Sequence, residues 1–359
     1  MSEINAKIKK GILYRPFLCR ELQEYSFENL ETALSNDSVF VLRIDDKNQF
    51  AVSRWVSAKR TRSYPYARVY DTLEFSGKRI TIIPILKDEG KDGDRDYLEW
   101  DTVSLMSLLG VYVIISYYTS AKKSAKKDQE HKNKITDQRF DIKQIKSEIK
   151  QLLSYHLDAL HWNLWQLDKA KETAQKALAS YERISRECSV EMHSKEFFEK
   201  RINELFKGAE SFKQFSRDLA QSAQKRESLT IQPKEKTDDT KTSLTIKNYL
   251  GGHYYFTVDE VKVDGNEIYL TEAKHTKDDK LPSSEDVKDG LWKMILFVNL
   301  EDVEMGGRKY APNAILKLTT GKNFSLSALT SSQSKFLEVL KKEAKENRFK
   351  LLINGDFVI

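Results

Sequence analysis

The sequence predicts a mixed α/β (α+β) fold, with a central mixed β-sheet flanked by helices and a large helical region in addition. Runs rich in β-branched and aromatic residues dominate 1–118, which we interpret as an N-terminal α/β region. Apolar residues recur at helical spacing across 119–230. A hairpin–helix–strand pattern fills 245–359, and a polar stretch without apolar periodicity, 231–244, is the predicted linker before it.

The composition excludes several classes of protein. A formal net charge of +6, with 40% hydrophobic and 32% charged residues, is typical of a rather polar globular protein with an anionic partner. The two cysteines, Cys19 and Cys188, predict neither a disulfide framework nor a Cys-rich zinc site. The most apolar run, Val103–Tyr118, is short and contains Gly110, and the first residues lack the apolar core of a signal peptide. We therefore expect a cytoplasmic protein that does not bind membranes.

Basic and aromatic side chains alternate within residues 54–68, a segment that contains no acidic residue. This composition suits phosphate contacts and base stacking, so we interpret the segment as a candidate DNA-binding surface. A solvated loop anchored by its aromatic residues is the alternative. The residues that we expect to contact DNA here are Arg54, Lys59, Arg60, Arg62 and Tyr64.

The rest of the N-terminal region reads as alternating strands and helices. A hairpin is predicted around 45–48, followed by paired strands at 68–75 and 79–86, a helix at 97–109 and a buried strand at 111–117. The acid-rich loop at 87–96, between the paired strands and this helix, lacks the spacing of a calcium-binding loop. We therefore expect the loop to be solvated. A second metal site or a regulatory site stays open there, and its candidate residues are Asp88, Glu89, Asp94 and Asp96.

The helical region is rich in lysine and contains neither Gly nor Pro between Thr119 and Gly208. Its apolar periodicity predicts four helical stretches, at about 142–167, 170–184, 197–206 and 212–219. The lysines on their polar faces are explained either as solvated helix surfaces or as an arm that embraces DNA.

The C-terminal region opens with a predicted β-hairpin. A two-residue loop at Gly265–Asn266 matches apolar residues across the strands near the turn and places Asp259 opposite Glu272, with Lys274 on the same face. Shifting the loop to Asp264–Gly265 would oppose charged to apolar side chains, so we prefer the first register. Two adjacent carboxylates repel each other unless a divalent cation lies between them. The hairpin therefore predicts metal-assisted hydrolysis of phosphodiesters.

Glu-x-Lys tripeptides recur along the chain, and three of them are Glu148-Ile-Lys150, Glu272-Ala-Lys274 and Glu343-Ala-Lys345. The first and last lie in helical patterns, where residues two apart do not share a face. The middle one lies in a strand pattern, where they do. It is also preceded, at hairpin distance, by an aspartate, and is followed by a predicted helix at 286–300 and a buried strand at 311–319.

This β-β-α-β order over 254–319, with Asp259 and Glu272-Ala273-Lys274, resembles the core of the PD-(D/E)XK nucleases, and type II restriction endonucleases in particular. The resemblance implies that Asp259, Glu272 and the backbone carbonyl of Ala273 hold Mg²⁺, with Mn²⁺ as a possible substitute. It implies that Lys274 positions the attacking water or helps to deprotonate it. The following helix offers Lys288 and Lys293 as DNA contacts, with Asp289 as a further polar candidate.

The resemblance thus implies a Mg²⁺-dependent, sequence-specific endonuclease of double-stranded DNA, and a homodimer if both strands are cut at a palindrome. The sequence departs from the family pattern at one point, because Val258 stands where a proline precedes the first acid. Glu260 and Asp264 therefore compete with Asp259 for that role. Three alternatives remain: a nuclease of repair or recombination, a nucleic-acid-binding protein without catalysis, and a hairpin whose opposite charges merely pair across strands.

Overall fold

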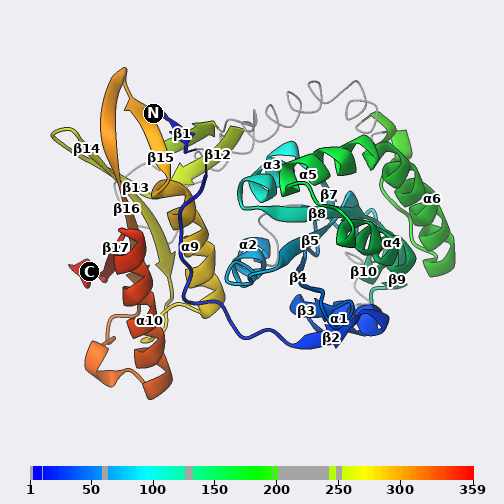
Figure 1. Ribbon diagram of the computed structural model, residues 1–359, viewed down its shortest axis with the longest axis horizontal. Coiled ribbons are helices and arrows are strands. Elements are labelled where there is room, and N and C mark those ends of the chain that lie inside the picture. The colour runs from blue at the N-terminus through cyan, green and yellow to red at the C-terminus, as the bar shows by residue number, and fades with distance from the viewer. Residues whose placement is uncertain are drawn as a thin grey trace. The chain divides into compact units, whose positions relative to one another are not determined.

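The protein divides into two compact units, which are described separately here. Unit 1 is Met1–Arg20 with Arg217–Ile359, and unit 2 is Glu21–Ser216 (Figure 1). Both are mixed α/β with mixed sheets, as the sequence predicts at that level of detail. The computed structural model describes residues 3–9, 11–58, 64–125, 132–196, 198–200, 242–247 and 253–359.

The described strands of unit 1 form one nine-stranded sheet in the order β12-β11-β1-β15-β16-β14-β13, with β17 beside β16 and β18 beside β17. Parallel pairs join β1 to β11 and β16 to both β14 and β17, whereas the other pairs are antiparallel. The strands are β1 (Glu3–Ile8), β11 (Thr242–Lys247), β12 (His253–Val258), β13 (Glu260–Asp264), β14 (Glu267–His275), β15 (Leu300–Met305), β16 (Arg308–Thr319), β17 (Lys350–Ile353) and β18 (Asp356–Phe357).

The N-terminal strand β1 lies inside this sheet, between β11 and β15. The sequence analysis assigned β1 to an N-terminal region at 1–118. The other predicted regions, 119–230, 231–244 and 245–359, also have boundaries that differ from those of the observed units. Its buried residues alternate with exposed ones, as expected of a strand with one face on the core. Residues 242–244 of the predicted linker belong to β11, because buried Leu244 and Ile246 join the same core.

The hairpin register at Gly265–Asn266 is confirmed near the turn, where Asp264 faces Glu267 and Val261 faces Leu270. The predicted continuation to a pair between Asp259 and Glu272 is wrong. The ladder ends at Glu260 and Thr271, and the chain bends at Asp259 because the preceding strand β12 pairs with β11 instead. β12 and β13 stand at opposite ends of the sheet order, with only Asp259 between them. The sheet therefore curls until its two edges meet at Asp259.

Two α-helices are described in unit 1, and the first lies close to the helix predicted at 286–300. α9 (Ser284–Phe297) packs on β14 and β16, and α10 (Ser331–Asn347) packs on β17 (Figure 1). The Ser283 hydroxyl caps α9 by accepting from the Asp286 amide at 3.1 Å, and acidic residues occupy its first turn. Thr330 and Gln333 form a capping box at α10. A 3₁₀ turn (Leu326–Ala328) precedes α10.

Unit 2 is built on a five-stranded sheet in the order β2-β3-β4-β5-β8, with two short hairpins, β6–β7 and β9–β10. The strands are β2 (Glu24–Ser26), β3 (Val39–Arg43), β4 (Gln49–Arg54), β5 (Lys78–Pro84), β6 (Leu86–Asp88), β7 (Arg95–Tyr97), β8 (Val111–Ser116), β9 (Tyr118–Lys123) and β10 (Ile135–Phe140). The helices are the 3₁₀ turn η1 (Phe27–Asn29), α1 (Leu30–Asn36), α2 (Pro65–Tyr70), α3 (Trp100–Leu108), α4 (Ile142–Leu153), α5 (Ala159–Asp168) and α6 (Ala170–Cys188).

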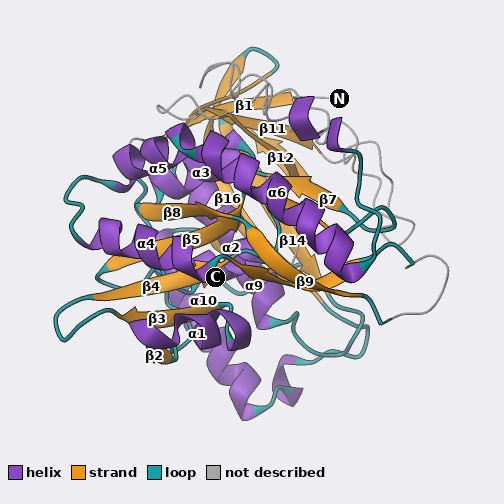
Figure 2. Ribbon diagram, turned by 90° about the vertical axis from the view of Figure 1, so that its right-hand side faces the viewer, coloured by secondary structure: helices purple, strands orange, loops and turns teal. Residues whose placement is uncertain are grey.

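Helix α5 covers the exposed edge of this sheet. The side chains of Asn163 and Gln166 accept from the amides of Val113 and Ile115 at 2.7 and 3.1 Å, and Trp162 donates to the Val113 carbonyl at 2.7 Å. These bonds satisfy the backbone groups of edge strand β8 that would otherwise offer a template for another strand. Helices α4 and α6 pack beside α5 on β8, and α6 also packs on β9 (Figure 2).

Several predicted elements of unit 2 are confirmed and three differ from the prediction. The hairpin at β3–β4, helix α3, strand β8 and helix α6 occur as expected. The helical stretch predicted at 142–167 is instead two helices, α4 and α5, separated by 154–158. Residues 68–75 do not pair with 79–86, because Pro65 begins helix α2 and β5 pairs in parallel with β4 and β8. The predicted helical region begins with the β9–β10 hairpin instead, where Tyr118 and Phe140 pack ring against ring.

The predicted helix at 212–219 and nearly all of that at 197–206 fall outside the described residues, as does linker segment 231–241. No helix in the described part of the chain is both long enough and apolar enough to cross a membrane.

The placement of β1 predicts that Ile4 contributes to the stability of unit 1, since its side chain is fully buried. We expect Ile4→Ala to lower the free energy of unfolding by about 2–5 kcal/mol, measured by chemical denaturation. Asn5→Ala, at an exposed position of the same strand, is the control and should stay within about 0.5 kcal/mol of the native protein. Equal effects of the two substitutions would contradict the central position of β1.

Candidate active site

The carboxylate of Glu272 is buried in unit 1 and is held by two ammonium groups. Glu272 lies on β14 and is 3% exposed. Lys274, two residues further along the strand, places its Nζ 3.0 Å from Oε1, and Lys293 on α9 donates to Oε2 at 2.5 Å. Because α9 packs on β14, strand and helix each supply one lysine to the same carboxylate.

Lys274 is held from a second side by α9. Its Nζ donates to Oδ2 of Asp289 at 2.8 Å, and its stem lies against Gly290. A Cβ at position 290 would lie 2.8 Å from Cδ1 of Leu316 and 3.2 Å from Cε of Lys274. The glycine inside this helix, which costs about 1 kcal/mol relative to alanine, thus allows the close approach of Lys274 and Leu316.

Asp259 reaches the same group from the bend between β12 and β13. Its Oδ2 accepts from the Ala273 amide at 2.8 Å, and its charge acts on Glu272. The amide and carbonyl of one strand residue point to the same side, so the Ala273 carbonyl faces the edge of β14 where Asp259 lies. The bend therefore brings Asp259 to Glu272 and Lys274 by a route different from the predicted strand pair.

The two competitors for the first acid lie elsewhere. Glu260 accepts from Lys317 at 2.5 Å, and its backbone remains in the β13–β14 ladder. Asp264 lies at the turn, opposite Glu267. The geometry therefore favours Asp259 over both.

Burial and charge act in opposite directions on the two central groups. Burial raises the pKa of Glu272, Lys293 and Lys274 lower it, and the net pKa is above the usual range. Burial lowers the pKa of Lys274, but the carboxylates of Glu272 and Asp289 outweigh it and raise the pKa. The raised pKa of Lys274 depends on an ionised Glu272. Each oxygen of the Glu272 carboxylate also has an ammonium group as its partner. We therefore assign the pair as an ion pair, with Lys274 as an ammonium.

The donor set matches a hard divalent cation in chemistry. Asp259, Glu272 and the Ala273 carbonyl offer the oxygen ligands that Mg²⁺ and Mn²⁺ take. Across the described residues, no three or more His, Cys, Asp and Glu side chains gather in a group that could hold a metal ion. Lys293 occupies Oε2 of Glu272, so a cation could use that oxygen only after this ammonium moves away.

The described residues among the predicted DNA contacts differ in exposure. Lys288 is 4% exposed, and the Lys293 ammonium is bound to Glu272 and to the Thr257 carbonyl at 3.0 Å. Both positions are more readily explained by interior roles than by phosphate contacts. In unit 2, Tyr64 is 46% exposed, whereas Arg54 lines an internal cavity. Lys59, Arg60 and Arg62 lie outside the described residues.

Sequence reasoning assigned Lys293 to DNA and so missed its contact with Glu272. Asp289 and Lys293 are four residues apart, and this spacing places them on one helix face. That signal was available, but nothing in the sequence fixed which side of β14 the helix would cover.

The acid-rich loop is solvated at its tip, where Asp92 and Asp94 are exposed, but not at its two ends. Asp88 and Asp96 are each 5% exposed, because β6 and β7 pair and carry them inward. Their partners differ: Asp88 contacts Nδ1 of His193 at 2.8 Å, and Asp96 accepts from Ser57 at 2.5 Å. These carboxylates thus belong to separate polar contacts.

Comparisons with known proteins give no relative for this chain: no protein-family model matches it, and neither the curated proteins nor the solved structures contain a match.

Replacing a glycine inside a helix by alanine usually stabilises the protein. At position 290 we expect the opposite, because Gly290 contacts Lys274. Gly290→Ala should lower the melting temperature, because the added methyl group displaces Lys274 or Leu316. Ser334→Ala, at an exposed position of α10, is the control and should raise it slightly. A melting temperature raised by both substitutions would show that the methyl group is accommodated.

The environment of Glu272 predicts a pH dependence for Lys293→Met. Without Lys293 the effect of burial is opposed by Lys274 alone, so the pKa of Glu272 should rise further. When the pKa of Glu272 is higher in the folded protein than its ordinary value of 4.5, protonation of Glu272 stabilises the folded protein. This stabilisation is complete below about pH 4.5 and is lost as the pH rises through the pKa of the folded state. The free energy of unfolding of the variant, relative to the native protein, should therefore fall above about pH 4.5.

Denaturant titrations at several pH values measure this difference. The control is a second pair, Glu272→Gln with and without Lys293→Met, in which the pH dependence should disappear. A difference that stays constant across pH in the first pair would rule out the assigned coupling.

Proposed function

We propose that this protein is a Mg²⁺-dependent endonuclease of the PD-(D/E)XK type that hydrolyses double-stranded DNA. The observation that carries the proposal is the cluster of Asp259, Glu272 and Lys274 around β14. In it, the Asp259 carboxylate bonds to the Ala273 amide and the two ExK side chains contact each other.

The topology around β14 supports the same proposal. β13 and β14 form an antiparallel hairpin, α9 follows, and the chain returns through β15 to β16, which pairs in parallel with β14. A mixed sheet flanked by a helix that contacts the acidic strand is the arrangement that a restriction-endonuclease-like core requires. Strand β15 is an addition to the predicted order.

In the proposed mechanism, Mg²⁺ would supply, when bound, the Lewis acidity that activates water and stabilises the charge developing on the phosphate. Asp259, Glu272 and the Ala273 carbonyl would hold the ion. Lys274 stays protonated, because two carboxylates raise its pKa. It therefore donates hydrogen bonds to the attacking water or to a phosphate oxygen and does not act as the base. Asp289 and Gly290 hold the Lys274 side chain in this position.

The substrate class follows from chemistry and charge. A net charge of +6 favours a polyanion, and the cluster supplies groups suited to a phosphodiester. The homodimer, the sequence specificity and the role in restriction remain predictions from the family resemblance. Cutting of unmethylated duplex at one short sequence distinguishes restriction from repair or recombination on branched substrates.

One observation favours a second candidate, a nucleic-acid-binding protein without catalysis. Lys293 and Lys274 already neutralise Glu272, so the site has cationic partners without a metal. Calorimetric titration with Mg²⁺ or Mn²⁺ separates the candidates: a nuclease should bind the ion and lose affinity in Asp259→Asn, whereas the second candidate binds neither ion.

The proposed roles predict that Lys274→Ala and Glu272→Gln each lower the rate of DNA cleavage by at least about a hundred-fold while DNA binding persists. Glutamine is chosen at 272 because alanine would leave two buried lysines without a partner. Cleavage of phage DNA with Mg²⁺ and a mobility-shift assay measure the two properties.

Two matched variants serve as controls. Glu260→Gln changes the rival acid in the β13–β14 ladder, and Lys345→Ala changes the exposed lysine of the Glu-x-Lys tripeptide on α10. Both should cleave at the native rate. Native activity in Lys274→Ala, or loss of activity in Glu260→Gln, would refute the assigned residues.

A further inference from the structure

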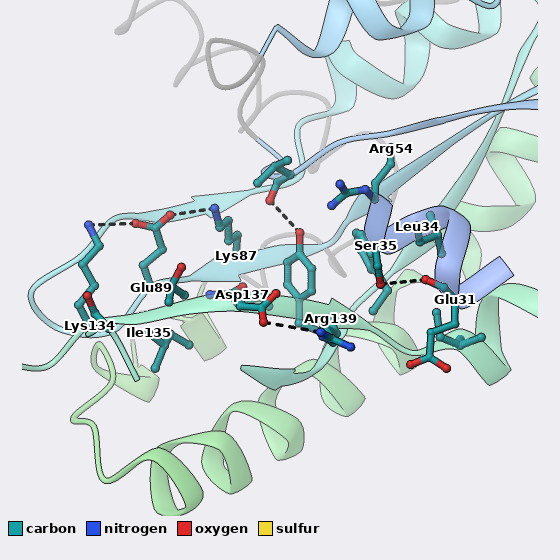
Figure 3. A pocket seen from close by; sticks show the side chains of 17 residues that line it. Glu31, Leu34, Ser35, Arg54, Lys87, Glu89, Lys134, Ile135, Asp137 and Arg139 are labelled. Atoms are coloured by element: carbon teal, nitrogen blue, oxygen red, sulfur yellow. Dashed lines mark hydrogen bonds and ion pairs between the residues drawn. The ribbon is translucent and has the colours of Figure 1, made fainter. Parts of the chain in front are cut away.

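Unit 2 contains a cavity of about 530 Å³ that the proposed nuclease chemistry does not use (Figure 3). Its lining comes from α1, the end of β4, the start of β6, and the β9–β10 hairpin. The volume lies within the range of pockets that hold small organic ligands. The cavity has both polar and apolar walls, so its chemistry can be derived from the residues of each.

Arg54, at the end of β4, points into this cavity (Figure 3). Its Nε is buried and has no hydrogen-bond partner among the described residues. Burial lowers the pKa of Arg54, and the phenol of Tyr118 acts in the opposite direction. A guanidinium has five donors in a planar fork that matches oxyanions, and a buried donor without a partner calls for one.

Two further cations line the same cavity and share one carboxylate. Lys87 lies 2.8 Å and Lys134 lies 3.6 Å from the two oxygens of Glu89 (Figure 3). The Lys87 and Glu89 side chains are each 12% exposed. Together with Arg54, this group carries an excess of two positive charges. The other acids that line the cavity, Glu31 and Asp137, are respectively exposed and paired with cations of their own.

Part of the cavity wall is apolar and fixed. The Tyr118 hydroxyl donates to the Val56 carbonyl at 2.7 Å, and the Tyr118 ring packs against Phe140 with centroids 4.4 Å apart. Leu34 and Ile135 complete this wall. A ligand that fills the cavity therefore needs an apolar or aromatic body as well as an anionic group.

We propose that this cavity binds a small organic phosphate, with the phosphate bound to Arg54, the positive charges of Lys87 and Lys134 attracting the anion, and the body against Tyr118 and Leu34. A phosphate monoester carries about −1.5 to −2 charges at neutral pH, which balances the excess of two positive charges. Its oxygens accept from the Arg54 fork. A mononucleotide has the required combination of dianion and aromatic body. The proposal does not depend on the function proposed for unit 1.

Calorimetric and thermal-shift titrations of the full chain test this site with three probes: AMP, inorganic phosphate and adenosine. AMP should bind most tightly, phosphate more weakly and adenosine weakest, because only AMP offers both the dianion and the body. Arg54→Gln should weaken AMP binding by about ten- to a hundred-fold, as expected for losing a charge-assisted contact.

Arg43→Gln is the matched control. Arg43 lies on β3 of the same sheet, is 53% exposed and pairs with Glu24 at 3.2 Å, outside the cavity lining. AMP binding should be unchanged in this variant. Lys134→Gln, at a more exposed position than Arg54, should weaken AMP binding as well and covers the case in which Arg54→Gln does not fold.

Three results would overturn the proposal. They are failure of AMP to bind the native protein at about 1 mM, adenosine binding as tight as AMP binding, and AMP binding that Arg54→Gln and Lys134→Gln leave intact.

Discussion

Unit 1 depends on the burial of one charge, the carboxylate of Glu272, and on the two ammonium groups that make this burial possible. Glu272 is 3% exposed, and a carboxylate buried in this way is stable only when its charged partners are close and well oriented. Lys274 supplies one partner from the same strand and Lys293 the other from α9. The helix must therefore lie on this face of β14, and Gly290 lets it approach closely. Stability and proposed chemistry thus draw on the same contacts.

The bend at Asp259 gives the cluster its third member. An unbroken strand would carry this residue along the ladder, whereas the bend sends β12 to β11 and turns the Asp259 carboxylate to the Ala273 amide. The edges of the curled sheet meet at this point. Repulsion between Asp259 and Glu272 is one of the causes that raise the pKa of Glu272. A site of this kind favours any cation that can replace an ammonium. Metal binding to Glu272 would therefore require the Lys293 ammonium to move away.

The charged side chains of unit 2 are arranged differently, with more cations than acids around its cavity. Around its cavity, Lys87 and Lys134 share Glu89, and the Nε of Arg54 is buried without a partner among the described residues. A cluster with excess positive charge and an apolar wall attracts an anion with an apolar body, whereas the Glu272 cluster, with Asp259 and Asp289 beside it, attracts a cation. The two units therefore offer sites of opposite preference.

The sequence by itself determined the local features whose physics is local: the hairpin register at Gly265, the helix near α9, and the strand setting of Glu272-Ala273-Lys274 as against the helical setting of two other tripeptides. Alternation, capping and turn chemistry act over a few residues and can be read directly. The tertiary structure decided the rest. It placed β1 inside the C-terminal sheet, bent the chain at Asp259, buried Lys293 against Glu272 and turned Arg54 into a cavity. Each depends on contacts between residues distant in the chain, for which a single sequence carries no local signal.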